Sequence, residues 1–377
     1  MARKKNVANP FSITSYMGKE FFCDRETETE QLHKALSNGR NVTLISPRKM
    51  GKTGLIRHVF QQINAQEAYC FYVDIYDTSN LLEFTKKFAE SVLTKRITPF
   101  STRVWKEISR VFGYLRPTIT VDPISGSPKC SVDVQTEREE ITLQQIFAFL
   151  EKANKRCYVA FDEFQTIAEY ADCKAEAVLR SYIQHLGNVN FIFAGSKKHL
   201  MLQMFSSASR PFFQSSQLMS IGPIPEDAYY DFALSYFQKH GQQIDVGTFH
   251  ELYGMVEGQT WYVQVLLNRL YQRGASVIGK QGVLYEIDQW LQEQIPVYQT
   301  YSRLLTERQL AVLRAVAKEK VVSEPGSNSF LRKYALGGYS TVRNVLITLT
   351  NKELLYQLDN GDYCVYDRFF GIWLANT

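Results

Sequence analysis

Residues 46–53, SPRKMGKT, have the types and spacing of a phosphate-binding loop. They follow the apolar stretch NVTLI (41–45) and open the amphipathic stretch 51–63, so the loop joins a predicted strand to a predicted helix. In such a loop, backbone N–H groups and the helix N-terminus converge on an anion. Lys52 is expected to reach the β- and γ-phosphates of a nucleotide, and Thr53 to place its hydroxyl on Mg²⁺. The sequence therefore predicts a nucleotide site with a magnesium ion.

The predicted loop departs from the G-x-x-x-x-G-K-[ST] pattern at its first position, which is Ser46. Glycine serves where φ exceeds zero or where a backbone approaches closely. The glycine nearest the phosphates, Gly51, is present, so we expect the loop still to bind a nucleotide. The predicted nucleotide-binding residues of the loop are Ser46, Pro47, Arg48, Lys49, Met50, Gly51, Lys52, Thr53 and Gly54.

An acidic pair ends a second predicted strand. In CYVAFDEF (157–164), an apolar run precedes Asp162 and Glu163. Asp162 is expected to act on the Mg²⁺ shell, and Glu163 to orient or deprotonate the attacking water. A solvated strand end is the alternative, because Asp and Glu are common there. The phosphate loop upstream favours the catalytic interpretation.

Two further residues are weaker candidates. Ser196 ends the apolar stretch NFIFAGS (190–196), where a polar group can sense a γ-phosphate, although Gly-Ser after a strand is also ordinary turn chemistry. Arg210, in SSASRPFF, is a candidate arginine finger, which stabilises charge during phosphoryl transfer. A surface arginine before a proline is the blander interpretation, and the sequence leaves both open.

Composition indicates a globular chain with more than one domain. At 377 residues the chain exceeds an ordinary single core, and 45% hydrophobic with 21% charged residues is typical of soluble domains. The net charge of +5 is compatible with a nucleic-acid partner but does not indicate one, since such binding needs clustered positive charge.

Cysteine usage and hydropathy predict a cytoplasmic protein. The six cysteines lie far apart without a C-x-x-C pair, which favours a reducing compartment. The basic N-terminus MARKKNVANPFS lacks a following apolar segment, so no signal peptide is expected. No apolar run approaches eighteen residues, so no membrane span is expected. The cysteines are Cys23, Cys70, Cys130, Cys157, Cys173 and Cys364.

The first part of the chain alternates strand and helix signals. Apolar stretches at 41–45, 68–76, 157–164 and 190–196 are separated by helical periodicity, which predicts an α/β fold with a parallel sheet and right-handed crossovers. Residues 116–134 alternate polar and apolar side chains around a Pro-Ile-Ser-Gly-Ser-Pro turn. This pattern predicts a β-hairpin inserted into a P-loop NTPase core.

The second part predicts two other domains. Strand signals stop after residue 222, and four stretches of helical periodicity predict an all-helical domain over 223–300. Residues 301–377 show three helical stretches, the first N-capped by Thr306, and then a hairpin around Asn360-Gly361. Three helices followed by a hairpin are the plan of a winged helix.

The N-terminal region completes the predicted organisation. Residues 1–15 are expected to form a basic arm, and Asp24 to N-cap the first helix of the core. The predicted parts are the arm (1–15), the P-loop core (16–222), the helical domain (223–300) and the winged helix (301–377).

Taken in order, several segments resemble the archaeal-type P-loop ATPases, a family of the STAND branch related to AAA+ ATPases. The resemblance runs from about residue 9 to the C-terminus and implies an ATPase core, a helical lid and a C-terminal winged helix, with ATP and Mg²⁺ as ligands. The segments are FFCDRETETEQL, SPRKMGKTGLI, YVDIY, VAFDEFQ, FIFAGS, the later G-x-x-W-Y-V-Q and the closing DRFFGIWL.

The resemblance also implies residue roles. The chain departs from relatives at two places. Ser46 replaces the usual glycine of the loop, and Gln259-Thr260 stand where relatives tend to carry Gly and Pro. The second departure bears on the lid's contact with nucleotide. The implied assignments are Phe22, Asp24 and Arg25 near the nucleotide base, Lys52 and Thr53 on phosphate and Mg²⁺, Asp162 and Glu163 as the acidic pair, Ser196 as sensor, and Arg210 as similar to an arginine after the sensor strand.

Three functions fit these features. The favoured one is an ATPase that acts as a slow molecular switch, with Mg·ATP hydrolysed between core and lid. The second is a winged-helix nucleic-acid module regulated by nucleotide. Residues 306–377 hold nine Lys/Arg and seven Asp/Glu, and the expected recognition helix offers only Arg343 and Lys352 as cations. An intramolecular or protein-contact role is therefore favoured over DNA binding. The third is a nucleotide-binding scaffold without hydrolysis, and self-association is compatible with all three.

Overall fold

The structure is a computed structural model that describes every residue except 1–8, 98–114, 122–127, 135–137, 172–173 and 359. The chain divides into two compact units. One unit is 14–224, and the other joins the N-terminal residues up to Ile13 to 225–377. Each is described separately below.

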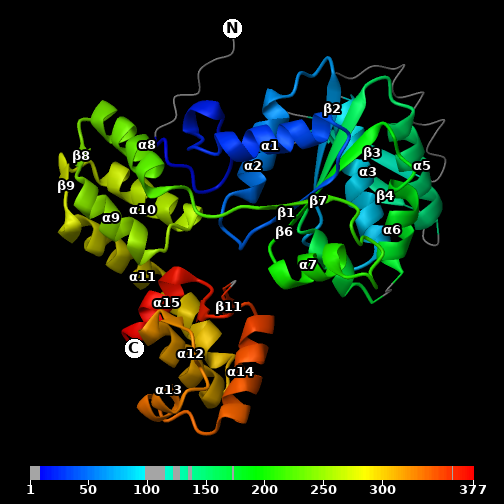
Figure 1. The fold of residues 1–377 in the computed structure, drawn as a ribbon. Helices are drawn as coiled ribbons and strands as arrows, with labels where there is room; N and C mark the ends of the chain where they lie inside the picture. The colour runs from blue at the N-terminus through cyan, green and yellow to red at the C-terminus, as the bar shows by residue number, and fades with distance from the viewer. Residues whose placement is uncertain (1–8, 98–114, 122–127, 135–137, 172–173, 359) are drawn as a thin grey trace. The chain divides into compact units, whose positions relative to one another are not determined.

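A parallel five-stranded sheet forms the centre of unit 14–224 (Figure 1). Its spatial order is β2-β5-β6-β1-β7, and every neighbouring pair is parallel. Four strands confirm the predicted ones, whereas β7, at the edge, was not predicted. The acidic strand β5 does not pair with β1, because β6 lies between them. The strands are β1 Val42–Ile45, β2 Ala68–Asp74, β5 Arg156–Asp162, β6 Val189–Gly195 and β7 Gln217–Ser220.

Side chains on the two faces of the sheet build two apolar clusters. Because side chains alternate along a strand, Phe161, Phe191 and Phe193 lie on one face, while Ala160 and Ile192 lie on the other. The first face packs against α3 (Leu81–Ile97), α5 (Glu139–Glu151), α6 (Ala175–Ile183) and α7 (Lys198–Ser206). The second face packs against α1 (Glu26–Ser37) and α2 (Lys52–Gln62).

The predicted hairpin insertion is present. β3 (Leu115–Val121) and β4 (Pro128–Val134) pair antiparallel with Leu115 opposite Val134, and the turn residues 122–127 lie outside the described residues. Val132 and Val134 of β4 are buried in the first apolar cluster, and the Val132 N–H donates to Glu90 Oε1 of α3 at 3.2 Å. The hairpin is therefore packed on the core.

The first helix begins later than the sequence predicts. Asp24 is not its N-cap: α1 begins at Glu26, and Arg25 holds the N-cap position without a side-chain hydrogen bond. Asp24 and Arg25 have φ of 52° and 72°, in the left-handed region. A side-chain N-cap is normally in the extended region, so this backbone path excludes Asp24 from capping.

The second unit opens with four helices, as predicted, but it is not wholly helical. The two-residue strands β8 (Gln243–Ile244) and β9 (Val277–Ile278) form a parallel pair that the sequence prediction missed. The last of the four helices continues past Pro296, so the expected boundary between 300 and 301 lies inside it. The helices are α8 Glu226–Lys239, α9 Val246–Met255, α10 Thr260–Arg273 and α11 Lys280–Arg303.

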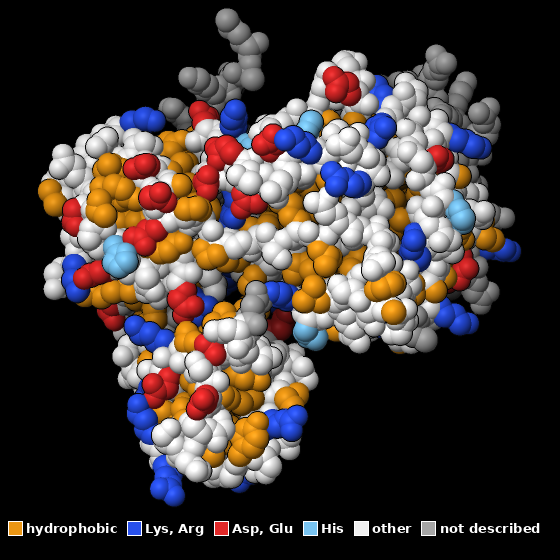
Figure 2. Space-filling view, in the orientation of Figure 1, with side chains coloured by type: hydrophobic (Ala, Val, Ile, Leu, Met, Phe, Trp, Pro, Cys, Tyr) orange, Lys and Arg blue, Asp and Glu red, His pale blue; other side chains and the backbone are white. Residues whose placement is uncertain are grey.

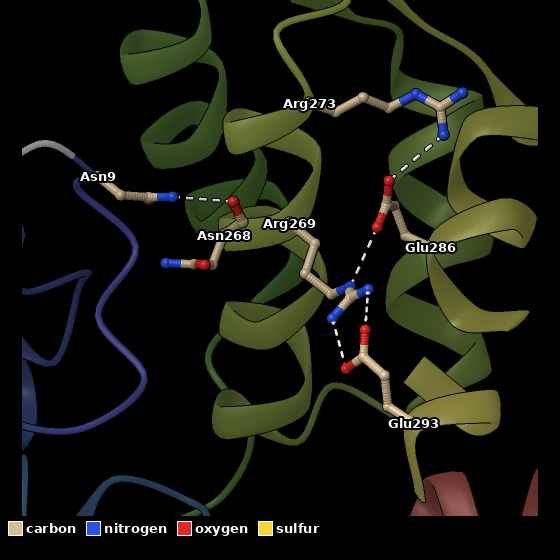
Figure 3. Close-up of polar contacts among 6 residues, drawn as sticks. All are labelled: Asn9, Asn268, Arg269, Arg273, Glu286 and Glu293. Atoms are coloured by element: carbon tan, nitrogen blue, oxygen red, sulfur yellow. Dashed lines mark hydrogen bonds and ion pairs between the residues drawn. The ribbon is translucent and has the colours of Figure 1, made fainter. Parts of the chain in front are cut away.

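Polar contacts tie these helices together (Figure 3). Arg269 of α10 donates to Glu286 at 3.0 Å and to both carboxylate oxygens of Glu293 at 2.9 and 3.1 Å; both glutamates lie on α11.

The N-terminal residues also contact these helices. The Asn9 side chain donates to the Asn268 carbonyl at 2.8 Å. Phe11 is fully buried, with its ring 5.2–6.1 Å from four aromatic rings of α8 and α10. Part of the expected N-terminal arm is thus built into this unit.

The C-terminal residues confirm the winged-helix plan. Thr306 caps α12 in a capping box with Gln309, as predicted for the cap. Gly361 has φ 91°, the left-handed conformation that a hairpin turn needs. Strand β10 and helix α15 were not predicted. The elements are α12 Glu307–Glu319, β10 Val321–Val322, α13 Asn328–Lys333, α14 Tyr339–Asn351, β11 Leu355–Gln357, β12 Tyr363–Val365 and α15 Arg368–Ala375, with sheet order β10-β12-β11.

Across the described part of the chain, no helix has the length and apolar character needed to cross a membrane.

Candidate nucleotide site

The loop 46–51 connects the end of β1 to the first turn of α2. Gly51 is the N-cap of α2 with φ 94°, a conformation that favours glycine. Ser46 is absent from the residues with positive φ, and it extends β1 by donating its N–H to the Gly195 carbonyl at 3.4 Å. The local backbone therefore requires glycine at 51 and not at 46.

Lys52 lies beneath this loop. Its side chain is buried, and Nζ donates to the carbonyls of Ser46 at 2.9 Å and Pro47 at 3.2 Å. Burial lowers the pKa of Lys52, against the raising effect of the Glu163 and Asp162 carboxylates. Carbonyl oxygens are weaker partners for an ammonium than phosphate oxygens, so this lysine can exchange them for a bound anion.

Asp162, at the end of β5, joins three elements. Its Oδ2 accepts hydrogen bonds from Thr53 Oγ1 of α2 and from the Tyr72 hydroxyl of β2, each at 2.6 Å. Its Oδ1 accepts from the Glu163 N–H at 3.0 Å. Burial, and next the charge of Asp162, raises the pKa of Tyr72, so this hydroxyl keeps its proton and donates it.

Glu163 follows in a left-handed conformation, with φ 56°. Its Oε2 accepts from Ser196 Oγ, which comes directly after β6, and from Gln165 Nε2, both at 2.6 Å. The carboxyl ends of β5 and β6 therefore bring the predicted acidic pair and Ser196 to one edge of the sheet. Thr53 joins the same group directly through its bond to Asp162, whereas Lys52 bonds the loop carbonyls and is influenced by the charges of Asp162 and Glu163.

The oxygen atoms of this cluster suit a hard cation. Thr53 offers a hydroxyl and Asp162 a carboxylate, and Mg²⁺ prefers such ligands together with phosphate oxygens. In the described ranges, no group of three or more His, Cys, Asp or Glu side chains is arranged to hold a metal ion. A metal at Thr53 and Asp162 fits only as the partner of a bound phosphate.

The residues expected near the nucleotide base lie next to α1 and α2. The Phe22 ring stacks on His58 with centroids 4.1 Å apart, and Phe22 and Asp24 line a cleft of about 450 Å³ next to α1 and α2. Arg25 is buried and donates to the carbonyls of Gly222 at 2.6 Å and Met50 at 3.4 Å. Arg25 thus ties this segment to the phosphate loop.

Arg210 lies apart from this cluster. It forms an ion pair with Glu176 in the first turn of α6, and its side chain is 29% exposed. Burial raises the pKa of Glu176, and the charge of Arg210 opposes that rise. The contacts of Arg210 resolved in the described residues are with Glu176 and with the backbone of its own turn. The geometry therefore does not bring Arg210 to Lys52, Asp162, Glu163 or Ser196.

Two domain families match the chain. The model described as "ATPase domain predominantly from Archaea" matches residues 22–266, and "Probable winged helix domain" matches 296–376. The first covers more than half of the chain. The chain belongs to this archaeal-type ATPase family. The match contains the phosphate loop, the acidic pair and Ser196 within one domain model, in agreement with the expected resemblance.

Solved structures share the fold of this family member. The Walker-type ATPase paby2304 of Pyrococcus abyssi is 17% identical, with a TM-score of 0.66, over 97% of this chain and 99% of that one. The Aeropyrum pernix ORC2 protein, in ADPNP–ADP complexes, is 15% identical with a TM-score of 0.60, over 97% and 95%. The Aeropyrum pernix ORC1 protein in complex with DNA is 11% identical with a TM-score of 0.54, over 97% and 96%. No curated protein matches in sequence.

Sequence reasoning missed two residues of the cluster. Tyr72 has the appearance of a core residue in an apolar strand, and its bond to Asp162 depends on the β2–β5 pairing. Gln165 follows the acidic pair by two residues in VAFDEFQ, and no local sequence signal distinguishes it from a surface glutamine.

Replacing Tyr72 with Phe should destabilise the unit 14–224. Asp162 would lose a hydrogen bond to a charged group, worth about 1.5–3 kcal/mol. The midpoint of thermal unfolding should fall by roughly 3–10 °C. Tyr182→Phe is a matched control, a half-buried tyrosine of the same unit whose ring packs on Phe147 in the first apolar cluster. An equal shift in the two variants would contradict the role given to the Tyr72–Asp162 bond.

Proposed function

We propose that this chain hydrolyses ATP and acts as a slow, nucleotide-dependent molecular switch. The observation that carries the proposal is the cluster at one edge of the sheet, where Thr53 bonds Asp162 and Ser196 bonds Glu163. A phosphate-loop lysine, a hydroxyl–carboxylate pair and a second carboxylate held by a sensor-like serine are the groups that phosphoryl transfer to water requires.

The residues take the roles expected from the sequence. Backbone N–H groups of the loop 46–51 and Lys52 hold the phosphates, and Phe22 and Asp24 lie by the base. Thr53 and Asp162 would hold Mg²⁺, which, when bound, neutralises charge on the phosphates. Glu163 orients the attacking water and takes its proton, and Ser196 keeps this carboxylate at the edge of the sheet.

Two contacts support slow turnover. Lys52 is engaged with loop carbonyls. Binding phosphate requires these bonds to be exchanged. Arg210 is engaged with Glu176, so its use as a finger would require that ion pair to open. Each exchange adds a barrier that a fast enzyme avoids by preorganisation.

Lys52→Ala should abolish tight ATP binding. Removing a buried cation that faces phosphate costs about 2–5 kcal/mol, which is a loss of roughly 30-fold or more in affinity. Isothermal calorimetry with Mg·ATP measures this loss directly. Lys152→Ala, an exposed lysine at the end of α5, is the control and should bind as the wild type does. Unchanged affinity in Lys52→Ala would remove the nucleotide site from this loop.

Glu163→Gln should separate binding from hydrolysis. The amide keeps the size of the side chain but cannot take a proton, so phosphate release should fall about 10²–10³-fold while ATP affinity is kept. The control is Glu169→Gln, an exposed carboxylate that pairs with Lys197. Wild-type turnover in Glu163→Gln would refute its role. A wild-type chain that binds ATP and shows no turnover above the Lys52→Ala background would favour the scaffold alternative.

For the winged helix we propose that its partner is a protein rather than DNA. On α14, the exposed positions include Tyr339 at 52% and Ile347 at 48% exposure, beside Arg343. Figure 2 shows hydrophobic as well as basic side chains on the surface of the part that holds α12, α13 and α14. Apolar exposure of this kind is typical of a protein-binding face, whereas DNA binding relies on several cations at phosphates.

The full chain should therefore bind duplex DNA weakly and with little dependence on salt. With one or two phosphate contacts, affinity should change by about tenfold or less between 50 and 200 mM salt. Fluorescence anisotropy with a labelled random-sequence duplex measures this. A fall in DNA affinity of about 10³-fold over that range, together with a loss of binding in Arg343→Ala but not in Lys152→Ala, would favour DNA over a protein as the partner of the winged helix.

A further inference from the structure

Gln165 is buried against the two groups that the proposed hydrolysis depends on. It lies in the 3-10 helix Phe164–Glu169, two residues after Glu163, and is 2% exposed. Its Nε2 is 2.6 Å from Glu163 Oε2 and 3.4 Å from Ser196 Oγ. A buried amide normally satisfies both its donors and its acceptor, and here its partners are the predicted general base and sensor.

The backbone of β6 sets the orientation of this amide. Ser196 N–H donates to Gln165 Oε1 at 3.3 Å. A backbone N–H can be satisfied only by an acceptor, so the oxygen of the amide must face Ser196 N and the nitrogen must face Glu163. The amide is therefore a donor toward the Glu163 carboxylate.

The space for this amide depends on the residue before Ser196. A Cβ on Gly195 would lie 2.5 Å from Gln165 Oε1 and 2.4 Å from Met201 Sδ. Such contacts are shorter than those of real Cβ atoms, although Gly195 itself does not have a positive φ. Glycine at this position therefore leaves room for the side chains of both Met201 and Gln165 to approach the backbone closely.

Both donors act on one oxygen of Glu163. Ser196 Oγ and Gln165 Nε2 each bond Oε2 at 2.6 Å, from the end of β6 and from the helix after β5. Two donors from different directions fix the rotation of the carboxylate plane, which is otherwise a soft torsion. The other oxygen, Oε1, is then the one that can meet a water molecule. The left-handed backbone of Glu163 (φ 56°) also relies on such side-chain bonds to be kept.

We propose that Gln165 is a positioning residue that sets the rotation of the Glu163 carboxylate for attack by water. This inference rests on the proposed ATP hydrolysis. Gln165 touches neither phosphate nor water in this role; it acts through Glu163. Its loss should therefore reduce the rate of the chemical step and leave nucleotide binding intact.

Gln165→Ala and Gln165→Glu test this role. Gln165→Ala removes the donor; Gln165→Glu keeps the size but replaces the donor with a carboxylate against Glu163. The expected result is a fall in kcat of about 10–100-fold in each, as for partners of other functional groups, with the ATP Kd by calorimetry within about twofold of wild type. Gln203→Ala, an exposed glutamine on α7, is the control and should match the wild type.

A double-mutant cycle with Glu163→Gln separates positioning from structure. If Gln165 acts only through the Glu163 carboxylate, adding Gln165→Ala to Glu163→Gln should lower kcat by less than about twofold more. Three results would overturn the inference. They are a full further loss of kcat in the double variant, a parallel loss of ATP affinity, and wild-type kcat in both Gln165→Ala and Gln165→Glu. Absence of turnover in the wild type would instead overturn the proposed ATPase function, and this inference with it.

Discussion

The hydrogen bond from Thr53 to Asp162 joins the first turn of α2 to the end of β5, across the intervening strand β6. Neither residue can keep this 2.6 Å contact unless β1, β6 and β5 are parallel and end at the same edge of the sheet. The buried Phe and Ile side chains of these strands hold that alignment from both faces. The core of the unit thus sets the positions of the residues proposed to bind phosphate and metal.

The same edge holds Glu163 in a left-handed conformation, beside a phosphate loop in which Lys49 and Gly51 also have positive φ. Glycine adopts such a backbone without strain, but a glutamate does so at a cost of about 1–3 kcal/mol. The bonds to Glu163 from Ser196 and Gln165 offset part of that cost, so the strained residue and its partners form one structural group. Placing strain at the proposed general base is consistent with a function that depends on its orientation.

Residue types and apolar runs predicted most of the fold, because buried strands and amphipathic helices leave strong local patterns. They missed β7, an edge strand whose side chains are mostly exposed, and the two-residue strands β8 and β9. They also misplaced the N-cap of α1, since Asp24 adopts a left-handed backbone that no local pattern indicates. The loop and the acidic pair follow from motifs, whereas Tyr72 and Gln165 join the cluster only through strand pairing and a contact with Ser196 N–H.

The first position of the phosphate loop illustrates what a glycine in a motif means physically. A serine can replace it where φ is not positive, and Ser46 meets that condition while Gly51 does not. The hydroxyl also adds polar contacts, since Ser46 Oγ donates to the Pro47 carbonyl at 3.1 Å and lies 3.4 Å from Lys52 Nζ. It shares with Lys52 the Pro47 carbonyl, which the lysine would leave in order to bind a phosphate in its proposed role. Serine at this position therefore keeps that carbonyl hydrogen-bonded in either arrangement of the lysine, which gives a physical reason for the loop to accept it.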